Sequence, residues 1–149
     1  MIVLSLIGGF LAGMAVPVQT SINSRLGREV GSPYLASLIS MSVGTIILII
    51  LVFAADHRIM FNISMFLSHP WWIWVGGGVL GITYLTSNIL LLPRLGAALT
   101  VVVTVLGQTI MAIFIDQFGW FDVPVHELNI PRLIGVAGML FGVYLMRKF

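Results

Sequence analysis

Long stretches without charged side chains constrain this chain more than any other feature. The stretch from Leu95 to Ile115 has 21 residues without a charge, enough at about 1.5 Å per residue to cross a hydrocarbon core of about 30 Å. Only 8% of the 149 residues are charged and 59% are hydrophobic, whereas a soluble domain has about 25% charged residues. The sequence therefore predicts an all-α, polytopic integral membrane protein.

Five such stretches predict five transmembrane helices, over residues 2–23, 33–55, 71–92, 95–115 and 131–148, in one domain that covers residues 1–149. Pro17 removes a backbone hydrogen bond within the first helix and is a candidate hinge. The segment 59–68 is too short to span and is expected to lie at the membrane interface. The last helix has only 14 residues without a charge, so Arg132 must either snorkel or lie against protein.

The distribution of charge predicts the orientation of the chain. Five spans place the termini on opposite sides of the membrane. One side receives five basic residues, namely Arg25, Arg28, Arg94, Arg147 and Lys148. The other side receives Arg58 and Arg132 together with four carboxylates. The positive-inside rule then places the C-terminus in the cytoplasm and the N-terminus outside.

Several function classes are excluded at this point. The chain has no cysteine, and His57, His69 and His126 lie in predicted outer loops without metal-ligand spacing, so no metal site and no cofactor are expected. It contains no phosphate-binding loop, catalytic triad or carboxylate pair, so an enzyme is not expected. A net charge of +2 from so few charges gives no reason to expect a nucleic-acid partner.

Polar side chains recur within the predicted helices. Thr100, Thr104 and Gln108 follow one another at four-residue intervals, which places them on one helix face. Threonine hydroxyls usually bond to carbonyls of their own helix, but an amide is harder to satisfy locally. Gln19, Asn88 and Gln108 therefore either hold helices together or line a polar cavity, and the sequence leaves both alternatives open.

Asp116 is the only carboxylate that adjoins a predicted span apart from the helix-ending Asp56. It is expected at the outer boundary, as a helix-end residue in water. If the span lay one turn deeper, Asp116 would become the only candidate proton-titrating group.

Small residues stripe the last predicted helix. Gly138 and Gly142 are four apart and Gly135 precedes them by about one turn, a spacing that lets two helices approach closely in lipid. Because this helix is short and terminal, we expect it to contact a second copy, although packing within one chain is the alternative.

The chain resembles the drug/metabolite transporter superfamily, specifically its short five-helix branch of inner-membrane exporters, the YdcZ-like proteins. The resemblance extends over essentially the whole chain. The residues that carry it are Pro17-x-Gln19-xxx-Asn23-xx-Leu26, Pro93-Arg94-Leu95-Gly96-Ala97, Gly107-Gln108, Asp116-Gln117-Phe118-Gly119, Arg132-xx-Gly135 and Gly142.

The resemblance implies that five helices are half of a transporter. Ten-helix relatives consist of two repeats of opposite orientation, with the pathway at their junction. A five-helix chain would complete this fold as an antiparallel homodimer, or with a paralogue of opposite orientation. It would reside in the bacterial inner membrane, and the modest bias of five basic residues against two leaves dual orientation possible.

We therefore expect an exporter of a small polar or amphipathic solute that works by alternating access. The residues expected along the solute pathway are Gln19, Asn23, Tyr84, Asn88, Thr104, Gln108 and Asp116. The alternative is a membrane subunit that does not transport but stabilises a partner protein, with its amides acting as clamps between helices.

Overall fold

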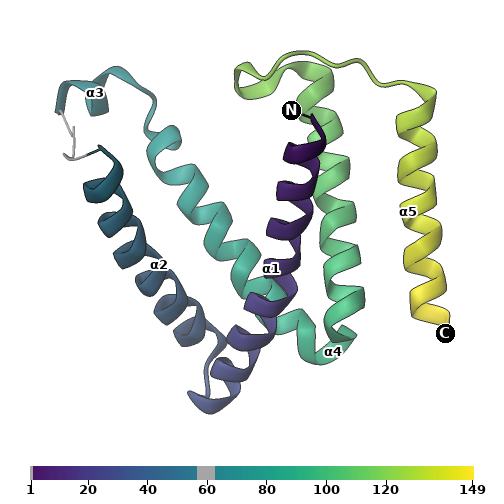
Figure 1. Cartoon of the computed structure of the whole chain (residues 1–149), viewed down its shortest axis with the longest axis horizontal. Helices are drawn as coiled ribbons and strands as arrows, with labels where there is room; N and C mark the ends of the chain where they lie inside the picture. Colours follow the sequence, from purple (N-terminus) through teal and green to yellow (C-terminus); the bar gives the residue numbers. More distant parts are fainter. Residues whose placement is uncertain (1, 57–62) are drawn as a thin grey trace. The chain divides into compact units, whose positions relative to one another are not determined.

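The computed structural model describes residues 2–56 and 63–149, and every regular element in that part of the chain is a helix (Figure 1). The predicted all-α class is therefore confirmed. The elements are α1 (Ile2–Glu29), α2 (Pro33–Asp56), α3 (Ile63–Ser68), α4 (Trp71–Phe118), the short 3-10 helix η1 (Trp120–Asp122) and α5 (Ile130–Lys148). The predicted interfacial segment is helical from Ile63, whereas its first residues, together with His57 and Arg58, lie outside the described residues.

Four of the described helices are long and apolar enough to cross a membrane, namely α1, α2, α4 and α5. Five spans were expected, and the difference lies in α4, whose 48 residues include both the third and the fourth predicted span. A helix of that length would extend about 72 Å, more than twice the hydrocarbon core. Its backbone leaves helical geometry at Gly96 (φ 78°, ψ 168°), a conformation that glycine adopts without a Cβ penalty.

The ends of the helices follow local chemistry as well as hydropathy. α1 continues to Glu29, past the predicted end near residue 23. The end of an apolar stretch does not by itself end a helix, because polar residues can also adopt helical geometry. Arg25 and Glu29 lie one turn apart on this extension at 4.0 Å. Gly31, with φ 72°, ends it. α5 begins beside Asn129, whose side chain accepts a hydrogen bond from the Arg132 amide at 3.0 Å.

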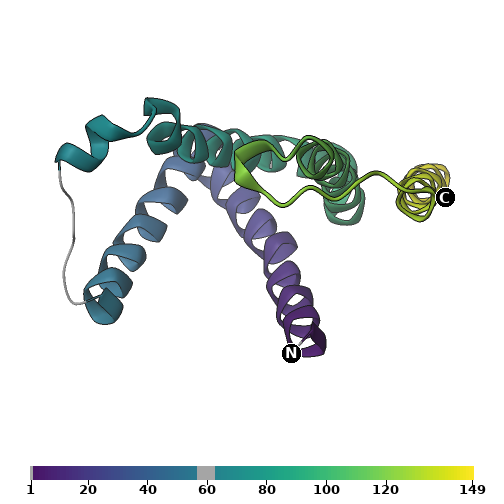
Figure 2. The same cartoon turned by 90° about the horizontal axis from the view of Figure 1, so that it is seen from above.

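The chain forms two compact units, Met1–Arg94 and Leu95–Phe149. In the first unit, α1 and α2 lie closest at the short turn that joins them and diverge toward their other ends (Figures 1 and 2). Gly27 lies at this close approach, where a Cβ atom would be in ordinary van der Waals contact with Ile89, Pro33 and Ala36 at 3.5–3.6 Å. Buried residues gather at this end of the unit, whereas the other ends of α1 and α2 are exposed and apolar.

The buried part of the first unit is mostly polar. The hydroxyls of Ser37 in α2 and Thr86 in α4 share a buried hydrogen bond of 2.9 Å. Asn23 of α1 donates to the Ser40 hydroxyl of α2 at 3.2 Å. Lipid supplies no hydrophobic force between helices, so hydrogen bonds and close packing must hold them together. The polar groups of α1, α2 and α4 thus have a structural role at this end of the unit.

The second unit pairs the C-terminal part of α4 with α5, and the two helices run antiparallel (Figure 1). Gly119 ends α4 in the left-handed conformation (φ 61°), where an added Cβ would also come within 2.8 Å of the Val125 side chain. The rings of Phe114, Phe118 and Trp120 stack in series near this end, with centroids 6.5 and 5.5 Å apart. The connection between the helices therefore turns sharply and then follows the end of α4.

Candidate functional site

Asn88 is the most unusual of the predicted pathway residues. Its side chain is only 1% exposed, and its Nδ2 donates to the Tyr84 carbonyl one turn earlier, at 2.8 Å. Its Oδ1 is buried and has no hydrogen-bond partner among the described residues. An unsatisfied buried acceptor costs about 1–3 kcal/mol. Asn88 is thus only half satisfied by its own helix and has a free acceptor for another group.

Gln19 and Gln108 present the opposite case, because both are exposed. Neither amide has a hydrogen bond to any residue that the structure describes. In hydrocarbon an unpaired amide is costly, and such groups normally face other helices or a water-filled cavity. The hydrogen-bond partners of these two amides must therefore come from water, from a solute or from another chain.

The threonines of the polar stripe are satisfied locally. The Thr104 hydroxyl donates to the carbonyls of Thr100 and Val101, both at 3.0 Å. The Thr100 hydroxyl donates to the Gly96 carbonyl at 2.7 Å. These hydroxyls need no external partner, so Gln108 is the residue of the stripe with unused hydrogen-bonding capacity.

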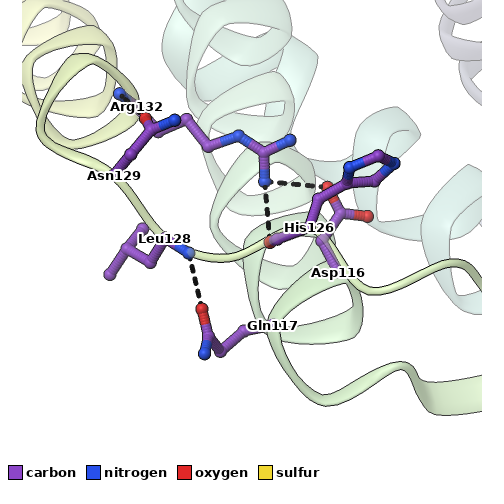
Figure 3. Close-up of polar contacts among 6 residues, drawn as sticks. All are labelled: Asp116, Gln117, His126, Leu128, Asn129 and Arg132. Carbon is purple, nitrogen blue, oxygen red and sulfur yellow. Dashed lines mark hydrogen bonds and ion pairs between the residues drawn. The ribbon is translucent and has the colours of Figure 1, made fainter.

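Asp116 forms an ion pair that the sequence did not predict (Figure 3). Its Oδ2 lies 3.1 Å from an Arg132 guanidinium nitrogen, and the two side chains are 28% and 33% exposed. The same nitrogen donates to the His126 carbonyl at 3.2 Å. α4 continues two residues beyond Asp116, to Phe118. The pair thus joins the end of α4 to the start of α5, and Arg132 lies against protein, which was one of its two expected alternatives.

Two further hydrogen bonds hold the connection between α4 and α5 against the end of α4. The Gln117 side-chain oxygen accepts from the Leu128 amide at 2.6 Å (Figure 3). The His126 amide donates to the Asp116 carbonyl at 3.0 Å. In the described part of the chain, no group of three histidine or carboxylate side chains could hold a metal ion.

The predicted pathway residues divide between the two units. Asn23 and Asn88 are buried in the first unit, where Tyr84 is 38% exposed and Gln19 is exposed. Thr104, Gln108 and Asp116 belong to the second unit. Sequence reasoning did not find the Ser37–Thr86 and Asp116–Arg132 contacts. The Asp116–Arg132 contact could have been predicted from the sequence, since these two opposite charges lie at the two ends of one connection between helices.

Comparison with protein families decides the identity of the chain. Residues 4–145 match the family described as "Putative inner membrane exporter, YdcZ". The chain belongs to the YdcZ family. The resemblance predicted from the helix motifs is therefore confirmed, over nearly the whole chain. Neither the curated proteins nor the solved structures that were searched include a match.

Membership in the YdcZ family agrees with the apolar helices in placing the chain in the inner membrane as a multi-pass protein. The description of the family is that of a membrane exporter and names no enzymatic activity. The glycine of its Pro93-Arg94-Leu95-Gly96-Ala97 motif is the residue at which α4 leaves helical geometry. The role of the pathway residues and the orientation of the termini stay predictions.

Proposed function

We propose that this YdcZ-family chain is one half of an exporter for a small polar or amphipathic solute. Two copies of opposite orientation, or one copy and an oppositely oriented paralogue, complete a ten-helix fold built from inverted repeats. The solute binds near the membrane midplane and passes by alternating access. Gln19, Asn23, Tyr84, Asn88, Thr104, Gln108 and Asp116 line its pathway, and Pro17 is a hinge.

One observation carries this proposal. Gln19 and Gln108 are exposed amides without a partner in the described chain, and they lie on helices that are apolar enough to cross a membrane. The unpartnered Oδ1 of Asn88 supports it, because a buried acceptor next to a solute pathway can bind a donor when the helices move. Such groups are costly in lipid, so they fit a cavity that contains water or solute.

The pairing of two chains is supported by the surface of α5. Nothing lies within 4 Å of a Cβ atom placed at Gly135, Gly138 or Gly142, so this stripe is open to another helix. A groove of about 510 Å³ adjoins Gly135, and its lining combines residues such as Thr109, Ala112 and Met139 with the charged pair Asp116 and Arg132. We assign this face to the dimer contact.

The cavity is tested by cysteine accessibility, because the chain has no cysteine of its own. Cysteines at Gln19 and Gln108 are expected to react readily with a charged, water-soluble thiol reagent in membranes. Cysteines at Val18 and Ile110, which are also exposed and lie on the same helices, are the matched controls. We expect these two positions to face lipid, so their cysteines should react much more slowly, because the reactive thiolate requires water. Equal reactivity at all four positions would contradict the cavity.

The same measurement separates the exporter from the alternative, a membrane subunit that stabilises a partner protein. In that alternative the amides are dry clamps, so cysteines at Gln19 and Gln108, and also at Thr104 and Asn88, should stay unreactive. No observation specifically favours this second function.

The antiparallel pair is tested by disulfide cross-linking along α5. If two copies cross near Gly138, position 135 of one chain lies opposite position 142 of the other. Membranes that contain both Gly135→Cys and Gly142→Cys chains should then form a mixed disulfide dimer. Each variant alone should not, because positions 135 and 142 are about 10 Å apart along the helix and a disulfide needs Cα atoms within about 7 Å. Self-cross-linking of each variant without mixed dimers would indicate a parallel pair instead.

A further inference from the structure

A pocket that the proposed pathway does not use lies at the end of the first unit where its helices converge. Its volume is about 260 Å³, and it is formed by the last turns of α1, the start of α2 and the segment of α4 just before the Gly96 break. Two arginines, Arg28 and Arg94, line it together with Ser24, and both arginines are exposed. The remaining wall is apolar and includes Ile89 and Leu90.

The charge of this pocket is uncompensated. No carboxylate lines it, and the nearby Glu29 pairs with Arg25 on the exposed surface of α1. Arg28 makes one hydrogen bond, to the Ser24 hydroxyl at 3.3 Å. Arg94 has no hydrogen bond or ion pair with any described residue. Each guanidinium carries five N–H donors, so the two side chains together have many donors but no negatively charged acceptor among the described residues.

We propose that Arg28 and Arg94 bind one phosphate group carried on an apolar chain. A phosphate offers several acceptor oxygens that match guanidinium geometry, and such pairs are among the stronger hydrogen bonds in proteins. The apolar wall fits the carbon part of the same molecule. Both arginines also belong to the side for which the sequence predicts the basic excess, where anionic lipid headgroups attract Lys and Arg. The ligand is either an anionic lipid or a soluble organic phosphate, and this binding does not depend on the chain being a transporter.

Lipid retention by the purified full-length chain tests the proposal. The probes are dioleoylphosphatidylglycerol, dioleoylphosphatidylcholine and inorganic phosphate, with binding measured by native mass spectrometry. Phosphatidylglycerol should bind more tightly than phosphatidylcholine, whose choline neutralises its phosphate. Arg28→Gln and Arg94→Gln should each weaken phosphatidylglycerol binding about fivefold, and the double variant about 25-fold. The fivefold change corresponds to the attraction of about 1 kcal/mol between one arginine and anionic lipid.

Arg25→Gln is the matched control, because it removes the same charge from the same helix outside the pocket and should change affinity less than twofold. If inorganic phosphate displaces the lipid, the site also accepts a soluble phosphate; if it does not, the ligand is the lipid. Both results support the site. Unchanged binding in the double variant, or an equal loss in Arg25→Gln, would overturn it. If the double glutamine variant folds poorly, the double variant Arg28→Lys with Arg94→Lys replaces it. This variant retains both charges and should bind phosphatidylglycerol more tightly than either single glutamine variant. Equal affinity of the native chain for the two lipids would also refute the proposal.

Discussion

Asp116→Asn is expected to lower the free energy of unfolding by about 2 kcal/mol. Exposed ion pairs contribute about 0–1 kcal/mol, and removal of one partner from a fully buried pair costs about 3–5 kcal/mol. The Asp116–Arg132 pair lies between these limits, because its side chains are 28% and 33% exposed. Loss of the negative charge leaves the Arg132 guanidinium with only neutral acceptors among the described residues, such as the His126 carbonyl. Denaturant titration of the chain in detergent micelles measures the change.

A double-mutant cycle isolates the pair from other effects of each substitution. Asp116→Asn, Arg132→Gln and their combination should give a coupling energy of about 1–2 kcal/mol. Arg25 and Glu29 provide the matched control pair, since they lie 4.0 Å apart with side chains 79% and 71% exposed, and their coupling should be at most about 0.5 kcal/mol. Equal coupling for the two pairs would show that the Asp116–Arg132 pair contributes no more than an exposed ion pair.

Gly96→Ala is expected to destabilise the chain by about 1–3 kcal/mol, the cost of a non-glycine residue in a sparsely populated backbone conformation. Nothing lies within 4 Å of a Cβ atom at this position, so the cost comes from the backbone (φ 78°) alone. The substitution also favours continuation of α4 as one straight helix, which would be far too long for one membrane crossing. The change is measured by the same denaturant titration.

Gly107→Ala is the matched control for Gly96→Ala. Gly107 lies in the same helix, its backbone is not in the left-handed region, and nothing lies near its added Cβ. Alanine in a helix interior is favoured over glycine, so this variant should be more stable by about 0.5–1 kcal/mol. Stability changes of the same sign for the two variants would mean that the break at Gly96 does not require glycine.

The two effects concern the positions at which the second unit begins and at which its helices are joined. Gly96 breaks the helical geometry between the two spans predicted within α4, and the Asp116–Arg132 pair joins the start of α5 to the end of α4. If alternating access occurs as proposed, Gly96 and the Asp116–Arg132 pair both constrain the movement of the helices in this unit. The pathway amides Gln19 and Gln108 lie elsewhere on their helices, so accessibility at those positions can be measured independently of either variant.

The hydropathy of the sequence was sufficient to predict the all-helical membrane class, and its helix motifs were sufficient to predict the YdcZ family. Hydropathy depends only on composition along a segment, so the apolar helices could be predicted closely. Their ends were harder to predict, because α1 continues through polar residues such as Arg25 and Glu29. The break within α4 was predicted close to its observed place, since the sequence indicated a connection at Pro93-Arg94 and the backbone leaves helical geometry at Gly96.

The candidate site was only partly predictable, because the sequence shows which residues can form hydrogen bonds but not which of them already have partners. Thr104 and Asn23 were correctly seen as polar groups, yet only the structure shows them bonded to Thr100 and Ser40. In residues 2–56 and 63–149, it gives no hydrogen-bond partner to the Asn88 oxygen, Gln19 or Gln108. The Asp116–Arg132 pair needed the fold for the same reason, since 16 residues separate the two charges and only the turn at Gly119 brings them together. The sequence by itself thus determined the class, the family and the kinds of polar groups, and the tertiary structure decided their pairing, because pairing depends on distances that composition does not contain.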